Sequence, residues 1–359
     1  MCESISRSRF YRSIWPNFIE QLVFSLILIS DSFFIALVSP EASIGVNATL
    51  PYAFIAAVFL SSCYQAISVY LGQQIGKNRL DCVSEVQSLL VVLAIVLGIF
   101  WALILYFLAP AFATLNGFDK QITTFFVLYL SLTSVSIPIK SLQMAYSCLL
   151  RVHEQAQINA KGNFIALGVN ISINYLLLVS FADSLNVGFM SVIYSTWVAR
   201  FCQLVYIVIA GRRYVQLTLS IGSRAIKGVK NALKSALFLS FESLSFYASS
   251  AVLVGITSHF AQSELVLRVL LNNIILLSSA WAVSVGRAAQ VITAKAIHSE
   301  TPNLFFIKRF SSRTALYGVG IVLFVFWLLE GQYVSYFNLN KTQLSLYLSI
   351  LSPTGSYVY

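Results

Sequence analysis

The sequence predicts an all-α polytopic membrane protein, and three observations lead to that fold class. Of the 359 residues, 58% are hydrophobic and only 10% are charged, whereas soluble domains carry about 25% charged residues. The mean hydropathy is +0.80. Apolar runs long enough to cross about 30 Å of hydrocarbon as helices recur along the whole chain.

Nine such runs are separated by polar gaps and predict nine membrane spans. They cover roughly 15–38, 50–71, 86–111, 122–149, 160–181, 187–210, 231–256, 265–294 and 313–337. A tenth begins near Gln343, but residues 344–359 are too few to cross a bilayer as a helix, which rises only about 1.5 Å per residue. We therefore expect about nine to ten spans in total, with an odd final segment or a truncated chain.

The basic residues predict the orientation of these spans. With the N-terminus inside, eighteen lysines and arginines fall on the inner side, whereas only Lys120, Arg268 and Lys341 fall on the outer side. The positive-inside rule therefore predicts a cytoplasmic N-terminus in a cell inner (plasma) membrane. Because the basic residues lie between apolar runs, the net charge of +10 does not indicate nucleic-acid binding. The inner residues are Arg7, Arg9, Arg12, Lys77, Arg79, Arg151, Lys161, Arg212, Arg213, Arg224, Lys227, Lys230, Lys234, Arg287, Lys295, Lys308, Arg309 and Arg313.

The longest polar gap divides the chain into two parts. We expect an N-terminal lobe of six spans at 1–210, a cytoplasmic linker at 211–230, and an incomplete C-terminal lobe at 231–359. A weak internal repeat supports this division, because residues 66–75 align with 282–291 with four identities in ten. Two halves of six spans each are a known plan for transporters.

Asp31 is the strongest candidate for a functional residue, because it lies two-thirds of the way along an apolar span. Placing a carboxylate there costs roughly 2.5–3.5 kcal/mol, so such residues are usually functional. Asn170 and Asn174 are four residues apart and therefore share one face of the fifth span. A carboxylate and two amides offer hard oxygen ligands for a cation, and burial would alternatively favour a protonated acid. The structural alternatives are that Asp31, which lies beside Ser30 and Ser32, forms hydrogen bonds only with backbone groups, and that the two asparagines form hydrogen bonds between helices.

Three further charged residues lie at membrane depth. Glu242 is about eleven residues into the seventh run, so it is either a second proton or cation site or a glutamate paired with a neighbouring base. Lys140 and Arg200 are possible charge partners, and Lys140 could neutralise Asp31 or Glu20. Snorkelling of the basic side chains toward the inner face is the alternative. Pro138 is expected to kink the fourth span, because proline removes a helical hydrogen bond.

Several motifs in order resemble the multidrug and toxic compound extrusion (MATE) family, most closely its NorM-like branch. Pro16 followed by Asp31 resembles the first span of that family, and residues 71–79 resemble its inner loop after the second span. Residues 149–151 with Asn170 and Asn174 are similar to its fourth-to-fifth-span signature, and residues 240–242 to its seventh-span glutamate. The resemblance implies a two-lobed, twelve-helix exporter in which Asp31 meets Asn170 and Asn174. It also implies an acid in the tenth span, which this sequence does not include.

The sequence therefore predicts a secondary antiporter that exports organic cations in exchange for H⁺ or Na⁺ by alternating access. A lipid-linked saccharide flippase of the same superfamily and a non-transporting remnant are the alternatives. We expect no cofactor, no metal site, no nucleic-acid partner and a monomer in the lipid bilayer. Enzymatic motifs such as HExxH, GxxxxGK[ST] and GxSxG do not occur. The five cysteines lack metal-site spacing and are expected to be reduced thiols.

Overall fold

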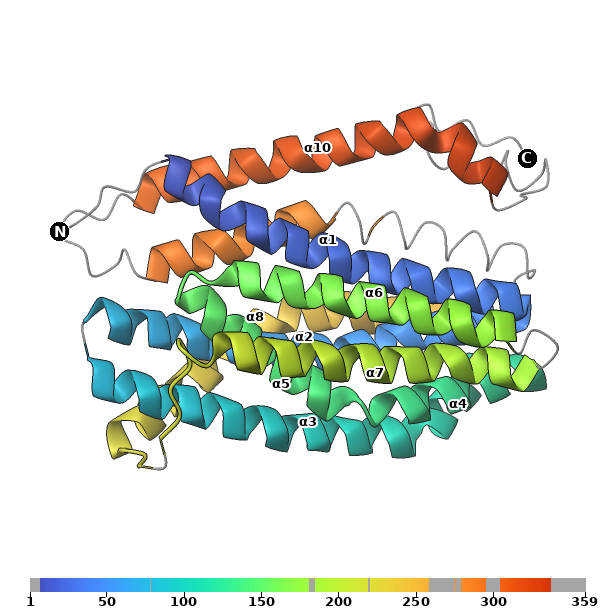
Figure 1. The fold of residues 1–359 in the computed structure, drawn as a ribbon, viewed down its shortest axis with the longest axis horizontal. Helices are drawn as coiled ribbons and strands as arrows, with labels where there is room; N and C mark the ends of the chain where they lie inside the picture. Colours follow the sequence, from blue (N-terminus) through green and yellow to red (C-terminus); the bar gives the residue numbers. More distant parts are fainter. Residues whose placement is uncertain are drawn as a thin grey trace.

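The computed structural model is a bundle of long helices that lie side by side with their axes roughly aligned (Figure 1). It describes residues 7–77, 79–180, 185–218, 220–257, 275, 279–294 and 304–336. No β-strand occurs among these residues, so the predicted all-α fold class is confirmed. The predicted tenth span, from Gln343 onward, lies outside the described residues.

The helices follow the predicted apolar runs closely. They are α1 (Arg7–Val38), α2 (Pro40–Gly76), α3 (Leu80–Asn116), α4 (Lys120–Ser134), α5 (Ile137–Val152), α6 (Ala156–Ser180), α7 (Leu185–Gly211), α8 (Ser223–Thr257) and α10 (Leu304–Tyr336), together with helical residues 279–294. The boundaries have local causes. Ser39 caps α2 by accepting a hydrogen bond from the Ala42 backbone N–H at 2.9 Å, and Pro40 suits the first helical turn. Helix α3 ends at Asn116 and is capped by Gly117, whose φ of 65° is unfavourable for other residues.

The run predicted at 122–149 is a broken span. Helices α4 and α5 meet at an angle of 53° across Val135 and Ser136. Pro138 is in the first turn of α5, where its missing N–H costs little and where it disfavours a helical conformation of the preceding residue. The kink predicted from Pro138 is therefore present.

Four described helical segments are long and apolar enough to cross a membrane: Ile14–Val38, Pro40–Gly76, Asp81–Asn116 and Gly188–Gly211. Two bent pairs, α4 with α5 and the two parts of α8, raise the number to as many as six. Many apolar side chains point outward rather than into the bundle. Phe100, Leu103 and Phe107 on α3, for example, are all more than half exposed. An apolar exterior is the arrangement that lipid favours.

One end of the bundle collects the basic residues. Helices α1, α3, α6, α8 and α10 begin at this end, and α2, α5 and α7 finish there (Figure 1, left). We call it the basic end and define it by Lys77, Arg79, Arg151, Arg212 and Arg213. It groups residues that the sequence placed on the inner side.

The interior of helices α2, α3 and α5 is fixed by one buried hydroxyl network. Tyr64 is fully buried, and its hydroxyl lies 2.5 Å from Ser141 Oγ. Ser141 Oγ in turn donates to the Ala94 carbonyl at 2.6 Å. Gly98 allows this close approach, because a Cβ there would lie 2.8 Å from the Pro138 Cα. This frame holds the break between α4 and α5 against α3.

Candidate functional site: a buried carboxylate among amides and hydroxyls

Asp31 points into the bundle. It lies on α1, seven residues before the helix ends at Val38, and is only 5% exposed. Its carboxylate accepts hydrogen bonds from side chains of α6 and α7. The alternative that Asp31 forms hydrogen bonds only with backbone groups does not describe these contacts. The neighbouring Ser32 donates elsewhere, to Asn47 Oδ1 at 3.3 Å.

Asn170 and Asn174 of α6 meet Asp31, as the family resemblance implied. Asn170 donates its Nδ2 to Asp31 Oδ1 at 2.8 Å, and Asn174 donates its Nδ2 to the same oxygen at 3.5 Å. Both asparagines are fully buried. Because they are four residues apart on one helix, they lie on the same face, and Asn174 Nδ2 also contacts Asn170 Oδ1 at 3.4 Å.

Two hydroxyls on α7 complete the cluster, and sequence reasoning did not select them. Thr196 donates its hydroxyl to Asp31 Oδ2 at 3.1 Å. Ser195 Oγ lies 2.9 Å from Asn174 Oδ1 and accepts from Asn170 Nδ2 at 3.3 Å. Both residues are buried. Adjacent hydroxyl residues in an apolar span were the available signal, but serine and threonine are common in membrane helices and commonly bond to their own backbone.

This cluster surrounds one negative charge with neutral groups. Among the described residues, no lysine or arginine approaches Asp31 within 4 Å. The carboxylate, the two amide carbonyls and the two hydroxyls provide hard oxygen atoms, which suit cations that prefer oxygen ligands. An ionised carboxylate that is held at close range only by neutral donors is costly in a medium of low dielectric.

Arg200 lies near this cluster without pairing with it, and Lys140 lies near Arg200. The Lys140 Nζ is 5.3 Å from the centre of the Phe24 ring, a cation–π geometry. Arg200 donates to the Ser136 hydroxyl and interacts with Asp31 only at longer range. In the described chain, neither residue forms an ion pair with Asp31 or Glu20 within 4 Å. Each lies about 17 Å along its helix from the basic end, so the basic-end surface is beyond the reach of either side chain.

Glu242 is on α8, but its side chain lies outside the described part of the structure. The candidate site therefore comprises Asp31, Asn170, Asn174, Ser195 and Thr196, contributed by α1, α6 and α7.

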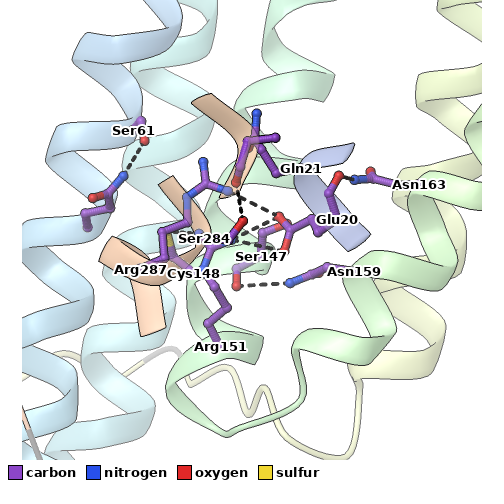
Figure 2. Close-up of polar contacts among 12 residues, drawn as sticks. Glu20, Gln21, Ser61, Ser147, Cys148, Arg151, Asn159, Asn163, Ser284 and Arg287 are labelled. Atoms are coloured by element: carbon purple, nitrogen blue, oxygen red, sulfur yellow. Dashed lines mark hydrogen bonds and ion pairs between the residues drawn. The ribbon is translucent and has the colours of Figure 1, made fainter. Parts of the chain in front are cut away.

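Glu20 has a role that the sequence did not reveal. It is buried, and its carboxylate accepts two hydrogen bonds from Arg151 Nη1, at 2.9 and 3.3 Å (Figure 2). Asn163 also donates its Nδ2 to the Glu20 carbonyl at 2.6 Å. The sequence predicts Arg151 among the inner loop residues, because it lies in the gap between the apolar runs at 122–149 and 160–181. Its helix continues to Val152 and turns the guanidinium inward.

The comparisons with known proteins agree with this arrangement. Residues 16–176 match the family model MatE, and this segment contains Asp31, Asn170 and Asn174. The resemblance to the MATE family is thereby confirmed. A comparison with curated protein sequences finds no significant match.

Solved structures extend the MATE likeness to nearly the whole chain. A MATE structure in complex with MaD5 aligns over 95% of this chain and 78% of its own, at 16% identity and a TM-score of 0.79. A mutant of the Vibrio cholerae MATE transporter VcmN aligns over 94% and 77%, at 12% identity and a TM-score of 0.75. A MOP superfamily transporter from Pyrococcus furiosus, described as having a binding pocket of reverse polarity, aligns over 96% and 76%, at 14% identity and a TM-score of 0.75. The chain therefore has the MATE transporter fold.

Proposed function

We propose that this MATE-fold chain is a secondary antiporter that exports organic cations in exchange for H⁺ or Na⁺. The observation that carries the proposal is the burial of Asp31 among neutral oxygen and amide groups with no described basic residue within 4 Å. Binding of the coupling ion at Asp31 would favour one orientation of the protein, and binding of the substrate would favour the other. Coupling requires this difference in affinity between the two states.

The proposal includes the membrane arrangement that the basic residues predict. The basic end would face the cytoplasm, with the chain in the cell inner (plasma) membrane, because lysines and arginines favour the inner side. The substrate and the coupling ion would enter the same bundle from opposite sides of the membrane. We propose that the protein acts as a monomer without a cofactor.

An efflux assay tests this function. The protein is expressed in a strain lacking other pumps, and export of a cationic dye is measured under an imposed proton or sodium gradient. We expect export by the wild type and its loss in Asp31→Asn, which preserves the shape of the side chain and removes the charge. Ser30→Ala is the control, since it lies beside Asp31 and should export normally. Export by Asp31→Asn at the wild-type rate would show that the Asp31 carboxylate is not needed for coupling.

A second candidate substrate class is supported by Lys140 and Arg200. Both lie at the same depth near the middle of the bundle, and neither has a described carboxylate within 4 Å. Secondary transporters bind their substrates near the bilayer midplane, so two basic side chains there would attract a substrate that carries an anionic group, such as a lipid-linked saccharide. The same strain and gradients with an anionic dye in place of the cationic dye distinguish the classes. Export of the anionic dye that is lost in Lys140→Gln would favour this candidate.

A further inference from the structure

A buried ionic cluster joins helices that are distant in the sequence. The Glu20 carboxylate of α1 binds Arg151 of α5 at 2.9 Å and also lies 3.9 Å from Arg287 Nη1, in helical residues 279–294. The side chains converge near the basic end, between α1 and the later helices (Figure 2). Glu20 and Arg151 belong to the proposed N-terminal lobe, whereas Arg287 belongs to the proposed C-terminal lobe. One carboxylate is therefore shared between the two lobes.

The two arginine contacts are unequal. Arg151 makes two hydrogen bonds to Glu20 and a third to the Cys148 sulfur at 3.1 Å. Arg287 is farther from Glu20, its side chain is 20% exposed, and its Nε has no hydrogen-bond partner among the described residues. Removal of the only partner of a buried carboxylate is costly. Departure of Arg287 would leave Glu20 with its closer partner, so the contact between the lobes is the one that can break at small cost.

Apolar side chains also pack beside this cluster, along a seam between α1 and helical residues 279–294. Trp281 stands edge-on to Trp15 and Phe18 of α1, with ring centres 6.2 and 5.0 Å apart. Ile14 of α1 is buried against Val285 and its neighbours. These contacts are made by the first turns of α1 within the bundle, on the same side of the structure as Glu20.

A second seam, between α2 and helical residues 279–294, is also tightly closed. A Cβ built on Gly72 would lie 3.4 Å from the Ala294 Cβ. At the same end, Gly228 of α8 lies so close to Tyr70 of α2 that no side chain fits without a shift of the tyrosine ring. The basic end is thus shut along both sides of the proposed lobe boundary.

We propose that Glu20, Arg151 and Arg287 form an ionic latch that holds the basic end closed, and that opening of this end separates Arg287 from Glu20. The inference rests on the proposed function, because only a transporter with alternating access must open this end. Arg151 keeps Glu20 neutralised while the latch is open, and Arg287 moves toward water. Arg287 is therefore the residue whose loss should favour opening without leaving a buried carboxylate unpaired.

A native cysteine reports the state of the latch. Cys148 is a free thiol, 3% exposed, and lies directly against Arg151. The experiment uses the full chain in membrane vesicles, with the other cysteines, Cys2, Cys63, Cys82 and Cys202, replaced by serine. The rate at which a water-soluble maleimide modifies Cys148 from the basic-end side is measured. We expect Arg287→Gln to increase this rate by about fivefold or more, the low end of typical coupling between sites.

The control is Arg212→Gln, which removes an exposed arginine at the same end and should leave the rate unchanged. Equal labelling rates in the wild type and Arg287→Gln would overturn the latch. The result does not depend on transport, so failure of the proposed function would instead appear as normal latch behaviour without export.

A disulfide across the second seam keeps the inference testable if Arg287→Gln does not fold. Gly72→Cys with Ala294→Cys places the two Cβ atoms close to the 3.5–4.5 Å that a disulfide requires. We expect the oxidised protein to resist maleimide at Cys148 and to transport nothing, with both restored by reduction. Transport at the normal rate while oxidised would show that the basic end need not open and would overturn the proposal.

Discussion

Asn170 donates its amide to the Asp31 carboxylate at 2.8 Å, across 139 residues of chain and between two membrane helices. Asn174, one helical turn along, makes a longer contact of 3.5 Å to the same oxygen. The unequal distances rank the two asparagines, since hydrogen bonds lengthened to 3.5 Å are weak. Asn170 should therefore matter more than Asn174 for ion binding at Asp31.

We predict that Asn170→Ala changes the half-saturating concentration of the coupling ion by about tenfold, because a hydrogen bond to a charged group contributes roughly 1.5–3 kcal/mol. The direction of the change identifies the ion. Loss of an oxygen ligand would weaken Na⁺ binding, whereas loss of a donor to the ionised carboxylate would tighten H⁺ binding. Transport rates measured against the concentration of each ion give the answer.

Asn47→Ala is the matched control for this series. Asn47 bonds to Ser32 and to the Ser43 carbonyl on its own helix, and no hydrogen bond joins it to Asp31 in the described part of the chain. It should leave ion dependence unchanged, and Asn174→Ala should have a smaller effect than Asn170→Ala. An ion dependence that is identical in wild type and Asn170→Ala would exclude Asn170 from the binding site.

Thr196 supplies the donor to the second carboxylate oxygen, and conservative variants separate its hydroxyl from its shape. Thr196→Val keeps the volume and removes the donor, so we expect a reduction of about tenfold in the apparent affinity for Na⁺ or a comparable shift in proton dependence. Thr196→Ser keeps the hydroxyl and should stay close to wild type. Thr49→Val is the control, because the Thr49 hydroxyl bonds only to its own helix, at the Val46 carbonyl. If Thr196→Val and Thr196→Ser behave alike, the hydroxyl is not part of the site.

The fold and three of the five site residues could be predicted from the sequence, for identifiable reasons. Long apolar runs define helices because the backbone must satisfy its own hydrogen bonds in lipid, and a lone Asp31 in such a run is conspicuous because burying a charge is expensive. The convergence of Asp31 with Asn170 came from the family resemblance. No local pattern in the residues encodes which helix faces which.

The remaining features depend on contacts that a linear pattern does not show. Ser195 and Thr196 look like any hydroxyl residues of an apolar span until α7 is placed against α1. Arg151 was assigned to a polar gap because helix ends are uncertain by several residues, and a guanidinium near a helix end can turn toward either water or the interior. Here the buried Glu20 carboxylate offers the better partner, so the guanidinium turns inward.

The Glu20–Arg151 pair is predicted to support folding. Because both side chains are buried, Arg151→Gln leaves the Glu20 carboxylate with only the longer 3.9 Å contact to Arg287 and should lower the free energy of unfolding by about 3 kcal/mol. Thermal unfolding in detergent measures the loss. The double variant Glu20→Gln with Arg151→Gln should lose less than the sum of the single variants, because the second change removes the unpaired charge. Strictly additive losses would show that the pair does not contribute as a unit.

A final prediction concerns the packing of α3 against the break between α4 and α5. At Gly98 a Cβ would lie 2.8 Å from the Pro138 Cα and 2.9 Å from the Ser141 Cβ. Because one of these neighbours is backbone, Gly98→Ala must push the helices apart and disturb the Tyr64–Ser141 hydrogen bond. We expect a loss of about 1–3 kcal/mol of stability, as in other overpacked interiors.

At Gly168 on α6, by contrast, an added Cβ meets nothing within 4 Å. Gly168→Ala should therefore be neutral or slightly stabilising, since alanine loses less backbone entropy than glycine in a helix. Thermal unfolding of the two variants in the same detergent tests the contrast. Equal stabilities would mean that α3 does not approach α5 as closely as the Pro138 contact requires.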